Sequence, residues 1–355
     1  MHKVMIHPAS YDDCRVAVEQ AFELFPQDMT GKKVLIKPNV LRMSAPDEHI
    51  VTHPAVLRAV IAKVAQMKPQ EIVVGDNPGL FSYGDNEKAF EKTGLMEAAG
   101  EYYRNLGDAP QPVAFQADFM AKVGISREIL DADIVISLPK FKTHGLTVMT
   151  GAIKNSYGFL PGAQKARLHR IAGTPERFHE LIVEVFRLRI PDLFIMDAVM
   201  GMEGNGPASP DLREIGQILA ADNAVALDGV VARMMGLEPG RLRFLQKARE
   251  LCLGDFDEHE IRIEGTLRVV PDFKLPPLGG EAIACDTAVQ EIIKGKTRVR
   301  PAADPDLCTA CGLCGEHCPV AAITMENDLP VTDAETCITC FCCQEICPEK
   351  AITLN

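Results

Sequence analysis

Two copies of one cysteine motif make up the last part of the chain. The first copy reads DPDLCTACGLCGEHCPVAAITME and the second reads DAETCITCFCCQEICPEKAITLN, with Cys337 following Cys308 by 29 positions. Both copies have the spacing C-x2-C-x2-C-x3-C-P, which marks an internal duplication. Cysteines this close together in an intracellular chain indicate metal binding rather than disulfides.

The spacing also predicts which metal centre binds. Three thiolates separated by two residues fit around one face of an iron–sulfur cube, and the fourth, which precedes a proline, reaches the neighbouring cube. Zinc sites use separated pairs of Cys or His, so the third in-phase cysteine of each copy does not fit zinc. We therefore expect two [4Fe-4S] clusters that exchange their fourth ligands. The expected ligands are Cys308, Cys311, Cys314 and Cys347 for one cluster, and Cys337, Cys340, Cys343 and Cys318 for the other.

The segment 303–355 resembles the bacterial-type two-cluster ferredoxin module, with every motif cysteine present. Its charge also sets it apart, because residues 301–355 contain nine acidic residues and one lysine. This difference in charge between the C-terminal segment and the rest of the chain predicts two domains. We expect an α/β domain over residues 1–278, a linker over 279–302 and a small α+β ferredoxin domain over 303–355.

The overall charge and hydropathy exclude some functions. The 49 acidic and 37 basic side chains give a net charge of -12, which argues against a nucleic-acid-binding surface. The first residues lack the basic and apolar regions of a secretory signal, and no run of about 18 apolar residues occurs. We expect a soluble, cytoplasmic protein with no membrane span.

Upstream of the cysteines, short apolar runs alternate with helix-length amphipathic segments. This alternation predicts a mostly parallel sheet flanked by helices on both faces. We expect a helix capped by Thr52, another over 85–100, and a third that Gly236 ends. The expected strands lie in KKVLIKPNV, EIVVGD, ADIVISLPK, PDLFIMDAV and IGQILAAD.

Polar residues follow the ends of several expected strands. Ligands of parallel sheets bind beyond the carboxyl ends of the strands, so a site is expected there. We expect the segments 140–145 and 197–206 to be loops at this edge. The residues expected to contribute from the first two strands are Lys37, Asn39, Asp76 and Asn77.

A basic stretch lies between Ile134 and Pro175, where no acidic residue occurs. It contains Lys140, Lys142, Lys154, Lys165, Arg167 and Arg170, together with His144 and His169. A solvated basic face is the alternative interpretation, but the apolar neighbours of these residues favour a pocket for a carboxylate or phosphate group. We expect Lys140, Lys142 and Lys154 to hold the anion beside Asn155.

The expected catalytic residues are His144 and Lys142. His144 would deliver a proton, because imidazole is the one unperturbed side chain that titrates near neutral pH. Lys37 and Asn39 would orient the ligand. No G-x-G-x-x-G or G-x-x-x-x-G-K-[ST] pattern is present, so neither a dinucleotide nor a nucleoside triphosphate is indicated.

The order KPNV, THP, GDNPG, ADIVISLPKFKTHGLTVMTGAIKNSYGFLPG and DAVMGMEGNGP resembles the DUF362 family over roughly residues 30 to 240. The resemblance implies an iron–sulfur protein, since members often carry a C-terminal two-cluster ferredoxin. A more distant similarity to the nickel-pincer lactate racemases implies a hydroxy-acid or cofactor pocket. No residue role is carried over from those enzymes.

These observations favour an oxidoreductase that relays electrons from a soluble redox partner, through two clusters, to a small anionic molecule on the α/β domain. Fusing the carrier to the site makes electron delivery intramolecular. A non-catalytic electron-transfer or assembly partner of another redox protein is the first alternative. An isomerase or racemase with structural clusters is the second.

Overall fold

The computed structural model describes residues 1–79, 85–172, 174–276, 301–316, 318, 320–337, 343, 347–349 and 351–354. Most of the expected linker, residues 279–300, lies outside the described residues, and so does the expected ligand Cys340.

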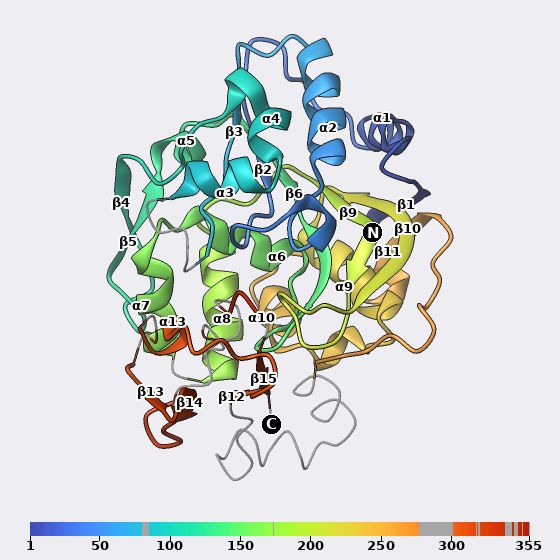
Figure 1. Cartoon of the computed structure of the whole chain (residues 1–355). Coiled ribbons are helices and arrows are strands. Elements are labelled where there is room, and N and C mark those ends of the chain that lie inside the picture. The colour runs from blue at the N-terminus through green and yellow to red at the C-terminus, as the bar shows by residue number, and fades with distance from the viewer. Residues whose placement is uncertain are drawn as a thin grey trace.

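Among these described residues, nine strands form the central sheet, part of which is labelled in Figure 1. They are β1 (His2–Pro8), β2 (Lys33–Pro38), β3 (Glu71–Val74), β6 (Ile134–Leu138), β7 (Lys140–His144), β8 (Val148–Met149), β9 (Leu193–Met202), β10 (Leu212–Ala221) and β11 (Ile261–Gly265). The main order is β11, β1, β10, β9, β6, β2 and β3, with β7 paired to both β8 and β9. The chain of strands from β9 through β6 and β2 to β3 is parallel, whereas β10 runs antiparallel to β9 and β1. The expected mostly parallel sheet is confirmed.

Helices cover both faces of the sheet, because its central strands are apolar on both sides. Val34 and Ile36 of β2 pack in one core, and Leu35 between them packs in the other. The first core includes α1, α2, α3 and α4, and the second includes α6, α8, α9 and α10. The helices are α1 (Cys14–Leu24), α2 (Pro54–Gln66), α3 (Asn86–Lys92), α4 (Leu95–Ala99), α5 (Arg127–Leu130), α6 (Gly151–Asn155), α7 (Ala163–Ala172), α8 (Pro175–Phe186), α9 (Ala224–Met234) and α10 (Arg243–Glu250). A separate two-stranded sheet pairs β4 (Pro110–Ala114) with β5 (Lys122–Ser126).

Two helix boundaries differ from expectation. His53, not Thr52, caps α2, because the His53 side chain accepts a hydrogen bond from Ala55 N. The Thr52 hydroxyl instead accepts from Asn39 N at 2.8 Å and donates to Leu138 O at 2.6 Å, so it joins the ends of β2 and β6. The expected helix over 85–100 is two helices, since Gly94 between them has a φ of 71°, outside the helical range.

The segments 140–145 and 197–206 were expected as loops, and this is wrong for most of both. Residues Lys140–His144 form β7, and β9 continues to Met202. β7 pairs in parallel with β9, where Lys140 is opposite Asp197. All five residues of β7 are buried, so their backbone groups need partners within the protein, and strand pairing supplies them.

The described residues of the C-terminal segment form two short antiparallel pairs and one short helix. β12 (Pro301–Ala303) pairs with β15 (Ile352–Leu354), β13 (Ile323–Glu326) pairs with β14 (Leu329–Thr332), and α13 spans Leu313–Glu316. This arrangement matches the expected small α+β ferredoxin. Among the described residues, no helix combines the length and apolar character needed to cross a bilayer.

Candidate functional site

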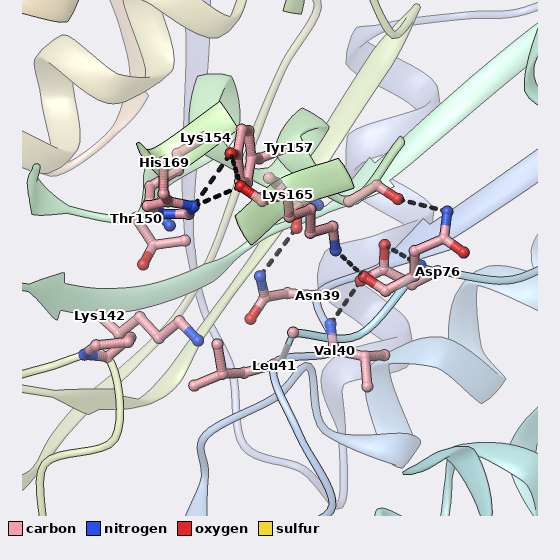
Figure 2. A pocket seen from close by; sticks show the side chains of 15 residues that line it. Asn39, Val40, Leu41, Asp76, Lys142, Thr150, Lys154, Tyr157, Lys165 and His169 are labelled. Carbon is pink, nitrogen blue, oxygen red and sulfur yellow. Dashed lines mark hydrogen bonds between the residues drawn. The ribbon is translucent and has the colours of Figure 1, made fainter. Parts of the chain in front are cut away.

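A cavity of about 70 Å³ with many polar lining residues lies at the carboxyl ends of β2 and β3 (Figure 2). Residues from six parts of the chain line it: the segments after β2 and β3, the α6 and α7 regions, and single residues of β7 and the 203–211 loop. The lining residues are Asn39, Val40, Leu41, Asp76, Asn77, Gly79, Lys142, Thr150, Lys154, Asn155, Tyr157, Gly158, Lys165, His169 and Pro207.

Six of the nine predicted site residues of the α/β body line this cavity. These are Asn39, Asp76, Asn77, Lys142, Lys154 and Asn155. Lys37, Lys140 and His144 do not belong to the lining. Strand ends that are far apart in sequence thus meet at one edge of the sheet, as the strand-end rule predicts.

A buried ion pair supports one wall of the cavity. Lys37 Nζ lies 2.8 Å from Asp76 Oδ1, and the two side chains are 0% and 3% exposed. Asp76 also accepts hydrogen bonds from Val40 N at 2.8 Å and Asn77 N at 2.9 Å. Burial lowers the pKa of Lys37, while the neighbouring Asp76 carboxylate acts in the opposite direction. Lys37 therefore fixes Asp76 at the cavity wall rather than lining the cavity itself.

A chain of amides joins this wall to α6. Asn155 Oδ1 accepts hydrogen bonds from Asn39 Nδ2 at 3.0 Å and from Lys37 Nζ at 3.3 Å. Asn155 Nδ2 donates to Ser137 Oγ at 2.9 Å. These contacts orient both amides and join the ends of β2 and β6 to the helix that carries Lys154.

Three lysines give the cavity its positive charge. Lys142 Nζ donates to Ile50 O at 2.8 Å, and Lys165 Nζ donates to Asn77 O and to Pro78 O. Lys154 is the third lysine of the lining. The one carboxylate of the lining, Asp76, is already paired with Lys37, so the lysines leave an excess of positive charge that attracts an anion.

Three lysines of the basic stretch are not part of a solvated basic face. Lys140, Lys142 and Lys165 are 0%, 1% and 7% exposed. Ammonium groups buried to this degree require polar partners, so they belong to internal sites rather than to a surface that docks a protein.

Lys140 belongs to a different cluster. Its Nζ lies 2.8 Å from Asp197 Oδ2 and 3.0 Å from the Tyr11 hydroxyl. Asp197 also accepts a hydrogen bond from His53 N at 2.9 Å. Burial lowers the pKa of Lys140, and Asp197 opposes that shift. This cluster joins β7 to β9 and to the start of α2, which is a structural task.

His144 is buried beside the lysines, and its ring does not carry the charge expected of a proton donor. Its Nδ1 accepts hydrogen bonds from Leu146 N at 3.1 Å and Thr147 N at 3.3 Å, so the proton of the neutral ring is on Nε2. Burial, followed by the charges of Lys154 and Lys142, lowers the pKa of His144 well below its usual value. The ring is therefore neutral at pH 7, and the charged proton donor that the sequence suggested is not populated.

Thr150 and Tyr157 are cavity residues that the sequence did not single out, and His169 was named only as part of the basic stretch. The Tyr157 hydroxyl donates to Lys165 O at 3.0 Å and lies 3.2 Å from His169 Nδ1. Lys165 and His169 are four positions apart on α7, so they share one helix face. That spacing was visible in the sequence. The position of Thr150 was not, because it depends on the turn between β8 and α6.

Asp228 of α9 positions α6. Its carboxylate accepts hydrogen bonds from Ala152 N at 2.6 Å and Ile153 N at 3.0 Å, both at the start of α6. Burial raises the pKa of Asp228 to about 7, and the two backbone donors limit the shift. A buried carboxyl in the α9 helix thus holds the short helix that presents Lys154 and Asn155.

The cysteine segment forms a second cavity. Its lining includes four cysteines, three from the first copy and one from the second, together with apolar side chains such as Met325 and Ile352. These cysteines are Cys308, Cys311, Cys314 and Cys347. Four thiol donors around one partly apolar cavity fit the ligand chemistry of an iron–sulfur cluster. Of the second expected set, Cys318, Cys337 and Cys343 are described and Cys340 is not.

Hydrogen bonds between the copies explain why Cys347 meets the first loop. Asp304 N donates to Ala351 O and Asp333 N donates to Ala322 O, each at 2.7 Å, so the start of either copy pairs with the end of the other. Within each copy a cysteine sulfur accepts from the amide four residues later, at 3.2 Å. The duplicated sequence therefore folds as two intertwined halves.

The parallel α/β body and the cysteine segment together define an iron–sulfur protein. Residues 34–233 match the family model described as "Domain of unknown function (DUF362)", and residues 300–348 match that of the "4Fe-4S dicluster domain". The chain belongs to the DUF362 family, which confirms the resemblance noted above. Its dicluster domain gives it an iron–sulfur electron-transfer role.

The chain is also similar to two other proteins, one by sequence and one by structure. The "Thylakoid-associated protein sll1697" of Synechocystis sp. is 34% identical over 235 residues, which cover 63% of this chain and 69% of that protein. A crystal structure of a Thermotoga maritima protein has 12% sequence identity and a TM-score of 0.39. The match covers 69% of this chain and 59% of the Thermotoga chain, which is less than two thirds of its length. A similarity this low carries no argument about the site.

Proposed function

We propose that this protein is an oxidoreductase that accepts electrons from a soluble redox partner and transfers them to a small anion held in the lysine-lined cavity, which is thereby reduced. The observation that carries the proposal is the combination, in one chain, of a dicluster ferredoxin domain and a buried cavity with three lysines. Covalent attachment raises the effective concentration of an electron carrier at such a site to the order of millimolar for a short linker.

Two [4Fe-4S] clusters would be held by the two crossed sets of four cysteines and, when bound, would supply one-electron transfer. Four cysteines around one cavity support the first set. The exchange of hydrogen bonds between the two copies supports the crossing.

The residues of the cavity have distinct roles in this proposal. Lys142, Lys154 and Lys165 bind the anionic group, because each ammonium offers several donors and no acceptor. Asn39 and Asn155 orient the ligand through the amide chain. Lys140 does not bind the anion in this proposal, because Asp197 already neutralises its charge.

His169 replaces His144 as the proposed proton donor. His169 lines the cavity, whereas His144 does not, and the lowered pKa of His144 leaves its ring neutral. Replacing His169 with Gln is expected to lower the rate of turnover, because an amide cannot deliver a proton as an imidazole does. The same substitution at His144 is expected to leave the rate nearly unchanged.

The test begins with an anaerobic preparation and mass spectrometry of any small molecule that co-purifies. The reduced protein is then mixed with that molecule, and cluster absorbance reports reoxidation. We expect Lys142→Met and Lys154→Met to keep cluster absorbance and to slow reoxidation at least tenfold. Lys122→Met, at an exposed position of β5, is the matched control and should behave as wild type. Equal reoxidation of all four proteins, or none in wild type, would refute the proposal.

A redox partner would dock on the cysteine segment. Leu307 and Val331 there are exposed large apolar side chains, at 50% and 44%, on a segment with nine acidic residues and one lysine. This surface also favours the alternative of a non-catalytic electron carrier that binds a basic partner. Electron exchange that weakens with salt, in a protein that never turns over the cavity ligand, would support that alternative.

We also propose a cytoplasmic location, because free cluster thiolates require a reducing compartment. The Synechocystis sp. relative is described as thylakoid-associated, so the alternative is a membrane-associated pool. Cell fractionation with an antibody to this chain distinguishes the two.

A further inference from the structure

Two oxygens at the lysine-lined cavity are buried without a hydrogen-bond partner in the described part of the chain. They are Asn39 Oδ1 and Thr150 Oγ1. Asn39 is 9% exposed and Thr150 is 2% exposed, and both residues line the cavity. Figure 2 shows both oxygens turned toward the side where Lys142 lies.

The orientation of the Asn39 amide is fixed by its neighbour. Asn155 Oδ1 accepts from Asn39 Nδ2, and Asn155 Nδ2 is already used to donate to Ser137 Oγ. Asn39 must therefore present its nitrogen to Asn155 and its oxygen to the cavity. A buried acceptor left without a partner costs about 1–3 kcal/mol, so such a group is uncommon and points to a missing partner.

The chemistry of these groups restricts the ligand. An amide oxygen only accepts, so its partner must carry an O–H or N–H donor. The lysines only donate, so the same ligand must carry an oxyanion. An ammonium group as the donor would meet repulsion from three lysines, which leaves a hydroxyl. An engineered apolar cavity of about 150 Å³ holds one benzene molecule, so a cavity of about 70 Å³ admits only a smaller ligand.

We propose that the cavity selects a small oxyanion that carries its own hydroxyl group, as in a hydroxycarboxylate or hydrogen phosphate. The lysines bind the oxyanion, and Asn39 Oδ1 and Thr150 Oγ1 bind the hydroxyl. This inference rests on the proposed anion site and adds the feature that distinguishes one anion from another.

Binding of matched anions to the full cluster-containing chain tests the idea, measured anaerobically by calorimetry at pH 7. Glycolate is compared with acetate, and phosphate with sulfate, since each first member has a hydroxyl that the second lacks. We expect at least one hydroxyl-bearing anion to bind about tenfold more tightly than its partner. The pair that shows the difference identifies the oxyanion as carboxylate or phosphate.

Thr150→Val is the informative variant, because it keeps the side-chain shape and removes one oxygen that has no partner in the protein. Thr150→Val should weaken the binding of the hydroxyl-bearing anion about three- to tenfold and leave the binding of the other anion unchanged. Thr150→Ser should bind both anions as wild type does. Thr143→Val is the control, since the Thr143 hydroxyl is also buried without a partner in the described chain but lies outside the cavity lining.

Two results would overturn the inference in different ways. Equal binding within both pairs, or no effect of Thr150→Val, would mean that the two oxygens do not select a hydroxyl, although the anion site would stand. Failure of all four anions to bind would remove the anion site as well.

Discussion

A methyl group added at Gly158 should disrupt the wall of the lysine-lined cavity. A Cβ at this position would lie 2.7 Å from Lys37 Nζ and closer still to Asp76 Oδ1, whereas real Cβ contacts below 3.0 Å are essentially absent from proteins. Both neighbours are held in place, because Lys37 also donates to Asn155 Oδ1 and Asp76 accepts from Val40 N and Asn77 N. The Gly158→Ala protein must therefore separate the ion pair or shift the backbone of the 156–159 turn.

These two responses set the upper and lower limits of the loss in free energy of unfolding. Breaking a buried ion pair costs about 3–5 kcal/mol, and overpacking relieved by backbone movement costs about 1–3 kcal/mol. We expect a loss of about 3 kcal/mol. At about 2–4 °C per kcal/mol for a body of this size, the thermal midpoint should fall by about 6–12 °C.

The assay is anaerobic thermal unfolding followed by far-UV circular dichroism, with Gly240→Ala as the matched control. A Cβ at Gly240 meets its nearest neighbours at 3.7 Å, so this change should be neutral or slightly stabilising. A midpoint for Gly158→Ala within about 2 °C of the control, when about 6 °C or more is expected, would refute the close packing of the ion pair against the turn.

Three further predictions follow from buried groups and from the cysteines. Lys140→Met should lower the free energy of unfolding by about 3–5 kcal/mol, because it leaves the Asp197 carboxylate buried without a cation. Adding Asp197→Asn should recover much of this loss, as measured by urea unfolding. A Lys140→Met protein as stable as the double variant would contradict this expectation. Since the pKa of Asp228 is raised to about 7, the folded state retains a proton that the unfolded state releases from about pH 4, so stability falls as pH rises from about 4 to 7. The difference in free energy of unfolding between wild type and Asp228→Asn should therefore become smaller from about pH 4 to about pH 7 and stay constant at higher pH. A difference that does not depend on pH would disprove the raised pKa of Asp228. Cys347→Ser should lower the iron and sulfide content of the purified protein toward half. Cys252→Ser, which removes an exposed thiol, is the control and should change neither. Unchanged iron in Cys347→Ser would show that this residue is not a cluster ligand.

Local patterns were enough to predict five strands of the central sheet and several of the site residues. The apolar runs that became β2, β3, β6 and β9 are buried on both faces, so their composition alone marks them. Asn39, Asp76 and Asn77 follow directly on such runs, and parallel topology brings the ends of neighbouring strands together.

The roles of individual lysines could not be predicted in this way. Lys140 and Lys142 are two positions apart in one basic segment, yet one is neutralised by Asp197 and the other lines the cavity. The pairing of β7 with β9 separates them, and Asp197 is far away in sequence. The protonation state of His144 has the same origin, since its burial and the charges around it exist only in the folded chain.

By itself, the sequence determined that this chain carries an α/β body and a duplicated cysteine segment, because spacing and periodicity are local properties. The tertiary structure decided which cations face a ligand, which are neutralised, and which buried oxygens lack a partner. Those properties depend on distance and on exclusion of water, and both arise only when segments remote in sequence pack together.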